Sequence, residues 1–136
     1  MTVQHDPVFT QSVKTAQAVC TAAKTTYNDA TNAVLLWTAG ADGSLIKKLS
    51  AAPRATVTAT QLQLYISKDS GTTLHLIDSE LMAAYTMAQT TAVPETAFGN
   101  ISESTPLRLG PTERLYVAAG VALAGGIVFA AEGEDF

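Results

Sequence analysis

Hydrophobic and polar residues alternate along much of this chain, most regularly between residues 61 and 67. The two sides of that segment are Leu62, Leu64 and Ile66 against Gln61, Gln63 and Tyr65. A period of two is that of a β-strand with one buried face. The segment is therefore predicted to be a half-buried strand whose second face contacts water.

Further short apolar runs are separated by residues that favour turns. Strands are expected at 15–26, 33–38, 44–50, 61–67, 72–78, 106–109, 114–119 and 127–132. In 72–78 we expect Leu74 and Leu76 to face the core, opposite His75 and Ile77. About seven or eight such strands predict an all-β fold, a single antiparallel β-sandwich or jelly-roll-like domain over residues 15–136. Residues 1–14 are polar and are expected to form an N-terminal arm.

The turns suggest how the strands connect. Asp42-Gly43 lies between two apolar runs and predicts a hairpin, because tight hairpin turns need positive φ. A second hairpin turn is expected at 68–71, and a closing hairpin around the glycines between 120 and 126. Pro53 predicts a loop over 51–56. The stretch from 82 to 103 is expected to be long and partly irregular.

Residues 115–131 carry no charge and could be mistaken for a membrane span. Three internal glycines are costly in a helix, so two strands around a turn are the favoured interpretation. The first seven residues lack the basic and apolar regions of a signal peptide. This predicts synthesis in the cytoplasm, where Cys20 stays reduced.

The composition narrows the class of protein. The chain has 136 residues, a net charge of -4 and only 15% charged residues, and alanine and threonine fill about a third of it. The single cysteine excludes a disulfide scaffold within the chain. Positive charge is too sparse for a nucleic-acid surface. A compact, weakly charged β domain is expected, without a nucleic-acid or membrane partner.

No motif points to catalysis. His5 lies in the arm and His75 in a strand, and neither has the partners of a nucleophilic triad. Asp78 and Glu80 fall on one strand face, and such a pair of carboxylates can hydrolyse glycosides. We expect them instead to lie at a solvent-facing strand end. The acidic end, 132–135, is expected to be solvated rather than to bind calcium. The glycine-rich turn fails the phosphate-loop pattern. We therefore expect no catalytic residues, metal or cofactor.

Two side chains keep alternative interpretations. Cys20 is either a small buried hydrophobic group or a thiol that pairs between subunits. Trp37 is expected in the core or at an interface. A carbohydrate-binding module would need an exposed aromatic platform, for which Tyr65, Tyr116 and Phe129 are the other strand aromatics. A small enzyme is the remaining class.

Several strand ends and turns carry a resemblance. They are the strand and turn Val34 to Ser44 with its "TAGADGS", the lead Pro111 to Leu115, and the ending Gly133-Glu134-Asp135-Phe136. From about residue 32 onward the chain resembles a group of small structural proteins of tailed bacteriophages. These typically show a "TAG-x-x-G" turn, a "P-x-x-x-L" lead into the penultimate strand, and a short ending of glycine, acid and aromatic. Residues 1–31 match no such pattern.

The resemblance implies a virion component assembled in the host cytoplasm. The leading hypothesis is a non-enzymatic capsid decoration protein that packs against itself, with a trimer favoured, and against the major capsid protein or other virion proteins. The alternative is a neck, collar or tail subunit. Small uncharged side chains suit such packing, because ordering them costs little side-chain entropy. The residues expected at interfaces are Thr2, Val3, Pro7, Phe9, Cys20, Trp37, Tyr116 and Phe136.

Overall fold

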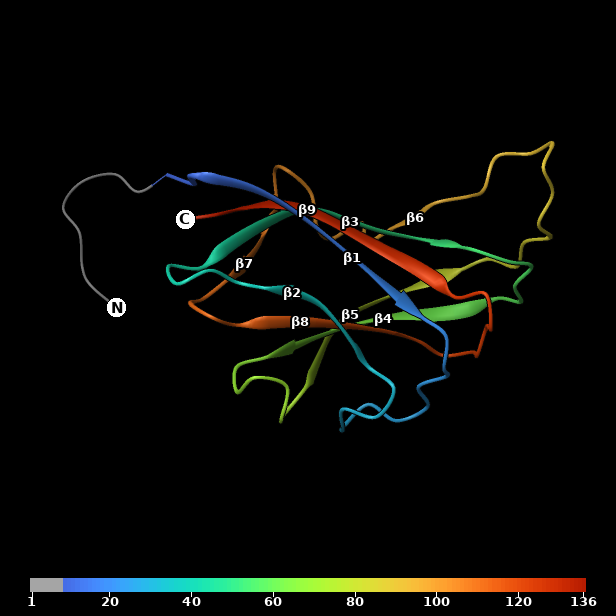
Figure 1. Cartoon of the computed structure of the whole chain (residues 1–136), viewed down its shortest axis with the longest axis horizontal. Helices are drawn as coiled ribbons and strands as arrows, with labels where there is room; N and C mark the ends of the chain where they lie inside the picture. The colour runs from blue at the N-terminus through green and yellow to red at the C-terminus, as the bar shows by residue number, and fades with distance from the viewer. Residues whose placement is uncertain (1–8) are drawn as a thin grey trace.

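The computed structural model describes residues 9–136 as two antiparallel β-sheets packed face to face (Figure 1). The strands are β1 (Ser12–Cys20), β2 (Val34–Thr38), β3 (Ser44–Pro53), β4 (Thr60–Ser67), β5 (His75–Met82), β6 (Thr96–Ala97), β7 (Leu107–Leu109), β8 (Arg114–Ala119) and β9 (Ile127–Asp135). The expected all-β sandwich is confirmed.

The strand order is that of a jelly roll. Sheet A runs β1-β9-β3-β6, and β7 also pairs with β3; sheet B runs β2-β8-β4-β5. Most connections carry the chain from one sheet to the other, so strands adjacent in sequence lie in opposite layers. This double-sheet arrangement shields most edges while letting both inner faces form one core.

This topology corrects two of the three predicted hairpins. The strands on either side of Asp42-Gly43 are β2 and β3, and they lie in different sheets. The same holds for β8 and β9 around the glycine-rich turn. Both turns reverse the chain, and Gly43 has the expected positive φ of 95°. The reversal joins layers instead of neighbouring strands. The third hairpin, β4–β5, is confirmed.

Several strand boundaries also differ from expectation. The first strand ends at Cys20 rather than Thr26, because residues 21–33 leave sheet A and cross sheet B. β3 continues through Pro53, where its last residues still pair with β9, so no loop begins at 51. The irregular stretch before β7 is confirmed and contains the two-residue strand β6.

The core lies between the inner faces of the sheets. Its members include Trp37 from β2, Leu62 and Leu64 from β4, and Phe129 from β9, all at most 1% exposed. Phe98 packs against Phe129 with ring centroids 6.5 Å apart. The inward residues of β4 are those that the sequence alternation predicted.

The outer face of sheet B is covered over β4, which contradicts the predicted wet face of that strand. Gln63 and Tyr65 are 1% and 0% exposed, because the segment 21–33 crosses over them. Leu76 was expected to face the core but is exposed on β5, while Leu74, just before the strand, is buried against Tyr65. The register shift between Leu64 and Tyr65 changes which β5 residues face inward.

Candidate functional site

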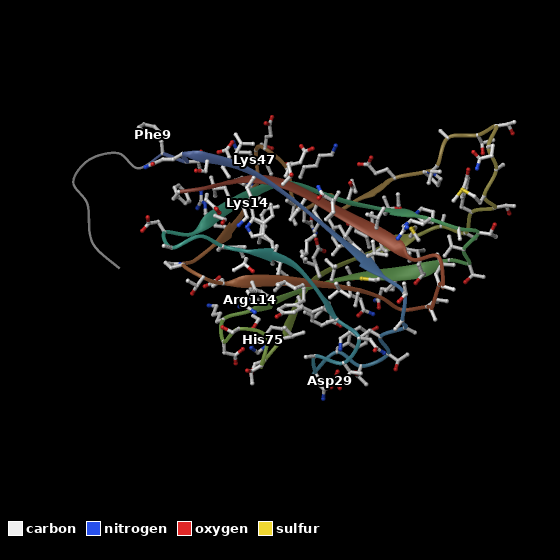
Figure 2. All side chains as sticks on the ribbon, viewed as in Figure 1. Phe9, Lys14, Asp29, Lys47, His75 and Arg114 are labelled. Carbon is white, nitrogen blue, oxygen red and sulfur yellow. The ribbon has the colours of Figure 1, made fainter. Side chains whose placement is uncertain are left out.

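The residues expected at interfaces differ widely in exposure. Thr2, Val3 and Pro7 lie outside the described residues, as does most of the predicted arm; its last three residues, 12–14, belong to β1. Phe9 is 73% exposed and lies three residues before the start of β1 (Figure 2). Tyr116 and Phe136 are half-buried. Cys20 and Trp37 lie in the core.

Cys20 is inaccessible. Its thiol points toward the Val117 carbonyl oxygen, with Sγ 3.5 Å away, and burial raises the pKa of the thiol to about 12. A disulfide between subunits would need a thiolate at the surface. The structure therefore agrees with the interpretation of Cys20 as a small buried hydrophobic group.

The indole ring of Trp37 packs beneath the Lys14 side chain. The Lys14 ammonium lies 4.9 Å from the centre of the indole ring and donates a hydrogen bond to the Thr38 carbonyl oxygen. The indole Nε1 is buried without a hydrogen-bond partner among the described residues. This arrangement joins β1 to β2 at one side of the sandwich and leaves no aromatic surface open.

The two acids of β5 lie on the same strand face, as the sequence predicted. They are half-buried and point toward the inner side of the sandwich, since Asp78 pairs with Leu64 and Glu80 with Leu62. Both carboxylates accept hydrogen bonds from the segment after β6. Glu80 accepts one from the Gly99 amide and Asp78 one from the Asn100 side chain, both at 3.4 Å. These bonds join β5 to the segment that follows β6.

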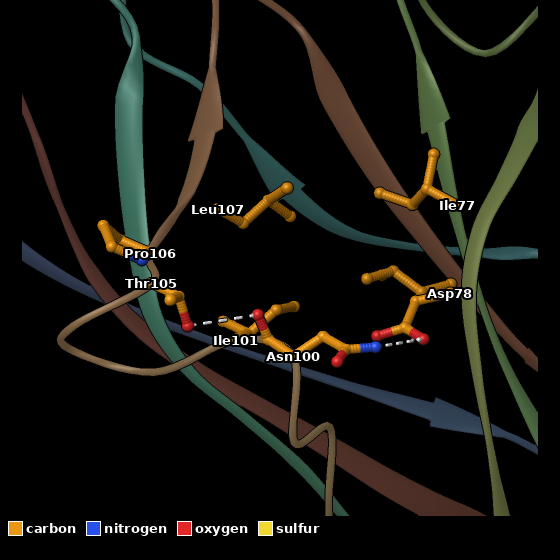
Figure 3. Close-up of a pocket in the computed structure, with 8 residues that line it drawn as sticks. Ile77, Asp78, Asn100, Ile101, Thr105, Pro106 and Leu107 are labelled. Atoms are coloured by element: carbon orange, nitrogen blue, oxygen red, sulfur yellow. Dashed lines mark hydrogen bonds between the residues drawn. The ribbon is translucent and has the colours of Figure 1, made fainter.

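A hollow of about 180 Å³ lies beside Asp78 (Figure 3). Its lining is Leu64, Ile77, Asp78, Asn100, Ile101, Thr105, Pro106 and Leu107. One oxygen of Asp78, Oδ2, is buried and has no hydrogen-bond partner among the described residues. Such an oxygen favours water or another hydrogen-bond donor in the hollow. Its lining contains no serine, cysteine, lysine or histidine.

The remaining candidate groups are dispersed. His75 is exposed on β5, on the sheet B side (Figure 2), and His5 lies outside the described residues. Among residues 9–136, no three His, Cys, Asp or Glu side chains gather as a metal site would need. The same residues contain no helix long and apolar enough to cross a membrane.

The acidic end is part of the sheet, which corrects the expectation of a solvated tail. Glu134 pairs with Lys47 at 2.8 Å, and Asp135 lies 3.5 Å from Lys14. The bond from Lys47 is the main reason that the pKa of Glu134 is lowered. For Asp135 the main cause of the lowered pKa is a bond from Ser44. These carboxylates fasten the last strand to β1 and β3.

A buried lysine holds the cover over sheet B, and the sequence analysis missed it. Lys24 is 2% exposed. Its ammonium donates to the Asp29 carboxylate at 2.9 Å and to the carbonyl oxygens of Asp29 and Thr31 at 2.7 and 2.9 Å. It also lies 5.3 Å from the Tyr65 ring centre. All of its donors are satisfied inside its own loop.

The bonds continue from this loop into sheet B. Gln63 donates to the Lys24 carbonyl oxygen at 3.2 Å and accepts from Tyr65 at 2.7 Å. Tyr27 donates to Gln61 at 2.8 Å. A signal was present in the sequence: Lys24 is the one charge between Lys14 and Asp29. This network holds the segment 21–33 against sheet B, and its role is structural because every group in it is already paired.

The outer face of sheet A contrasts with that covered face. Strand pairing places two rows of side chains across it, Val19–Val128–Ala52 and Gln17–Ala130–Ser50–Ala97. We call these seven residues the small-residue patch. None is charged, and the next row, through Glu132 and Lys48, restores charge. Apart from Gln17, its side chains are small or β-branched and lose little entropy on contact, which suits repeated packing.

Searches against family models, curated proteins and solved structures returned no match to the chain.

Proposed function

We propose that this chain is a non-enzymatic virion structural protein of a tailed bacteriophage, and specifically a capsid decoration protein. In this role it packs against itself and against the major capsid protein. The observation that carries the proposal is the small-residue patch on the outer face of a jelly-roll sandwich. The turn and strand-end resemblance from about residue 32 onward supports the same class.

The architecture supports the proposal by analogy. Jelly rolls occur in viral capsid proteins and in lectins, and the fold alone does not choose between them. A lectin needs aromatic side chains open to a sugar. Here Tyr65, Phe129 and Trp37 are at most 1% exposed. Tyr116 is half-buried. The strand aromatics therefore form no open platform, which disfavours the carbohydrate-binding alternative.

The charge distribution supports packing as well. The charged residues nearest the patch, Lys48 and Glu132, lie in the next row, at its border, and the Lys48 ammonium is 3.9 Å from the Glu95 carboxylate. A partner that covers the patch itself would desolvate no charge there, because none of its seven residues is charged. Small side chains let two backbones approach closely over such a surface.

The proposal is tested with particles assembled without this protein. Purified protein should co-sediment with those particles in a saturable amount. Ala130→Arg places a long cation in the patch and should reduce binding at least tenfold. Thr72→Arg, in the β4–β5 turn of the other sheet, is the matched control and should bind like the wild type.

Two results would overturn the proposal: wild-type protein that does not bind the particles, and particles that keep normal stability without it. Cryo-electron microscopy of intact virions locates the bound protein. Density over the capsid surface supports decoration. Density confined to the neck or tail contradicts decoration and favours the alternative virion subunit.

A further inference from the structure

Strand β1 leaves one of its edges open. It pairs with β9 along its whole length, Ser12 with Asp135 through Cys20 with Ile127. No other strand of the part that the structure describes pairs with β1. Nine residues at strand spacing give an edge of about 30 Å. An edge of that length can template another strand.

The other sheet edges are blocked or short. β5 has a register shift, and its inward acids are bonded to the segment after β6. β2 has a shift between Leu35 and Trp37. β6 and β7 have only two and three residues. β1 alone among these edges is long, contains no proline or glycine, and keeps an unbroken register with its neighbour.

The sequence of β1 is complementary to itself. Reading outward from Ala16, Thr15 matches Gln17, and Val13 matches Val19. Two antiparallel copies centred on Ala16 would therefore place Val13 of each opposite Val19 of the other. These outward valines are 86% and 36% exposed. Pairs of β-branched residues on one sheet face stabilise strand pairing.

The single charge of β1 does not oppose this pairing. Lys14 points toward β2, where it is bonded to the Thr38 carbonyl oxygen and lies 3.5 Å from Asp135. In the register above it lies beside Ala18 of the other copy, a small side chain. An inward-pointing charge usually prevents pairing at a strand edge, because pairing would bury the charge without a partner. Here the charge already has its partners.

We propose that two copies of this chain pair through β1, antiparallel about a two-fold axis near Ala16. The two A sheets then form one continuous sheet, and the two small-residue patches become one face. This inference stands without the proposed function. It requires only that the β1 edge is open and that its sequence matches itself.

The test measures the mass of the full-length protein in solution by sedimentation equilibrium over a range of concentrations. The wild type should form a dimer of twice 14.2 kDa. Val13→Lys combined with Val19→Lys places lysines opposite each other at both ends, and should raise the dissociation constant at least tenfold. Val13→Lys combined with Val19→Glu places opposite charges together and should restore the dimer.

Leu81→Lys is the matched control, because Leu81 is 70% exposed on β5 in the other sheet. It should leave the dimer unchanged. Thermal unfolding of each variant establishes that it is folded. A wild-type monomer, a trimer, or a dimer indifferent to the valine substitutions would overturn the pairing. A trimer that still binds particles would leave the proposed function standing.

Discussion

Lys24 shows how one buried charge can decide what a sheet face looks like. The alternation along β4 predicts that Gln63 and Tyr65 contact water, and locally that prediction is sound. A loop distant in sequence overrides it, because Lys24 folds the segment 21–33 into a compact cover with Asp29. No pattern within β4 could reveal that cover.

Replacing Lys24 with methionine should destabilise the fold. Lys24→Met keeps most of the side-chain volume but removes three hydrogen bonds and leaves two carbonyl oxygens without a donor. The expected loss is about 2 kcal/mol in the free energy of unfolding, measured by urea denaturation. Lys68→Met, at a side chain 73% exposed, is the control and should change stability by less than about 0.5 kcal/mol. An equal loss in both variants would contradict the role given to Lys24.

Gly133 illustrates a constraint set by backbone contact. A Cβ there would lie 2.0 Å from the Leu45 carbonyl oxygen and 2.9 Å from the Ile46 Cα, beside the register shift in β3. Gly133→Ala should therefore cost about 2–3 kcal/mol of stability, seen as a lower urea midpoint. Gly99→Ala is a matched control, since nothing lies within 4 Å of that position. Gly133→Ala with wild-type stability would show that the two strands separate without cost.

At the level of elements, the strand positions were predictable and most of the pairing was not. Alternation and turn residues located β2, β4, β8 and most of β9, because both signals are local. A turn such as Asp42-Gly43 reports a reversal of the chain, but hairpins and layer-to-layer connections both need one. The choice depends on which strand edges are free elsewhere in the fold, and that information is not local.

The C-terminal strand should make stability depend on pH. Bonds from Lys47 and Ser44 lower the pKa values of Glu134 and Asp135 from 4.5 and 3.8. A lowered carboxyl pKa contributes stability above the unfolded value, and this is lost as pH falls through the folded value. The free energy of unfolding should thus decline from about pH 4.5 downward.

Urea denaturation at a series of pH values measures this decline. Glu134→Gln should flatten it, because the amide does not titrate. Glu132→Gln changes an exposed acid on the same strand and should leave the decline close to that of the wild type. If both variants behave alike, the pair with Lys47 is not its source.

At the scale of the whole molecule, the composition indicates which kinds of side chain cover the surface, but not which residues lie there. The many alanines predict small side chains on the surface, and three of the seven residues of the small-residue patch are alanines. The sequence left Cys20 and Trp37 between the core and an interface, and both lie in the interior. Alternation assigns a residue to one face of a strand, while only the packing of two sheets decides whether that face is covered.

The burial of Cys20 makes it a reporter for opening of the sandwich. Its thiol lies between β1 and β8, so a reagent reaches it only when the two sheets separate. The pKa of about 12, against an ordinary 9.0, lowers the thiolate fraction about a thousandfold. Labelling by a thiol reagent should be very slow in the native protein. It should accelerate in urea in parallel with unfolding followed by circular dichroism.

A matched variant separates access from chemistry. Cys20→Ala combined with Thr15→Cys puts the thiol on the exposed side of the same strand, where labelling should be complete before unfolding begins. Rapid labelling of Cys20 in the native protein would mean that β1 detaches locally while the rest stays folded. The sandwich would then not open as one unit, and the edge strand would be its weakest element. Slow labelling that follows global unfolding instead places β1 within the cooperative core, as pairing between two copies requires of it.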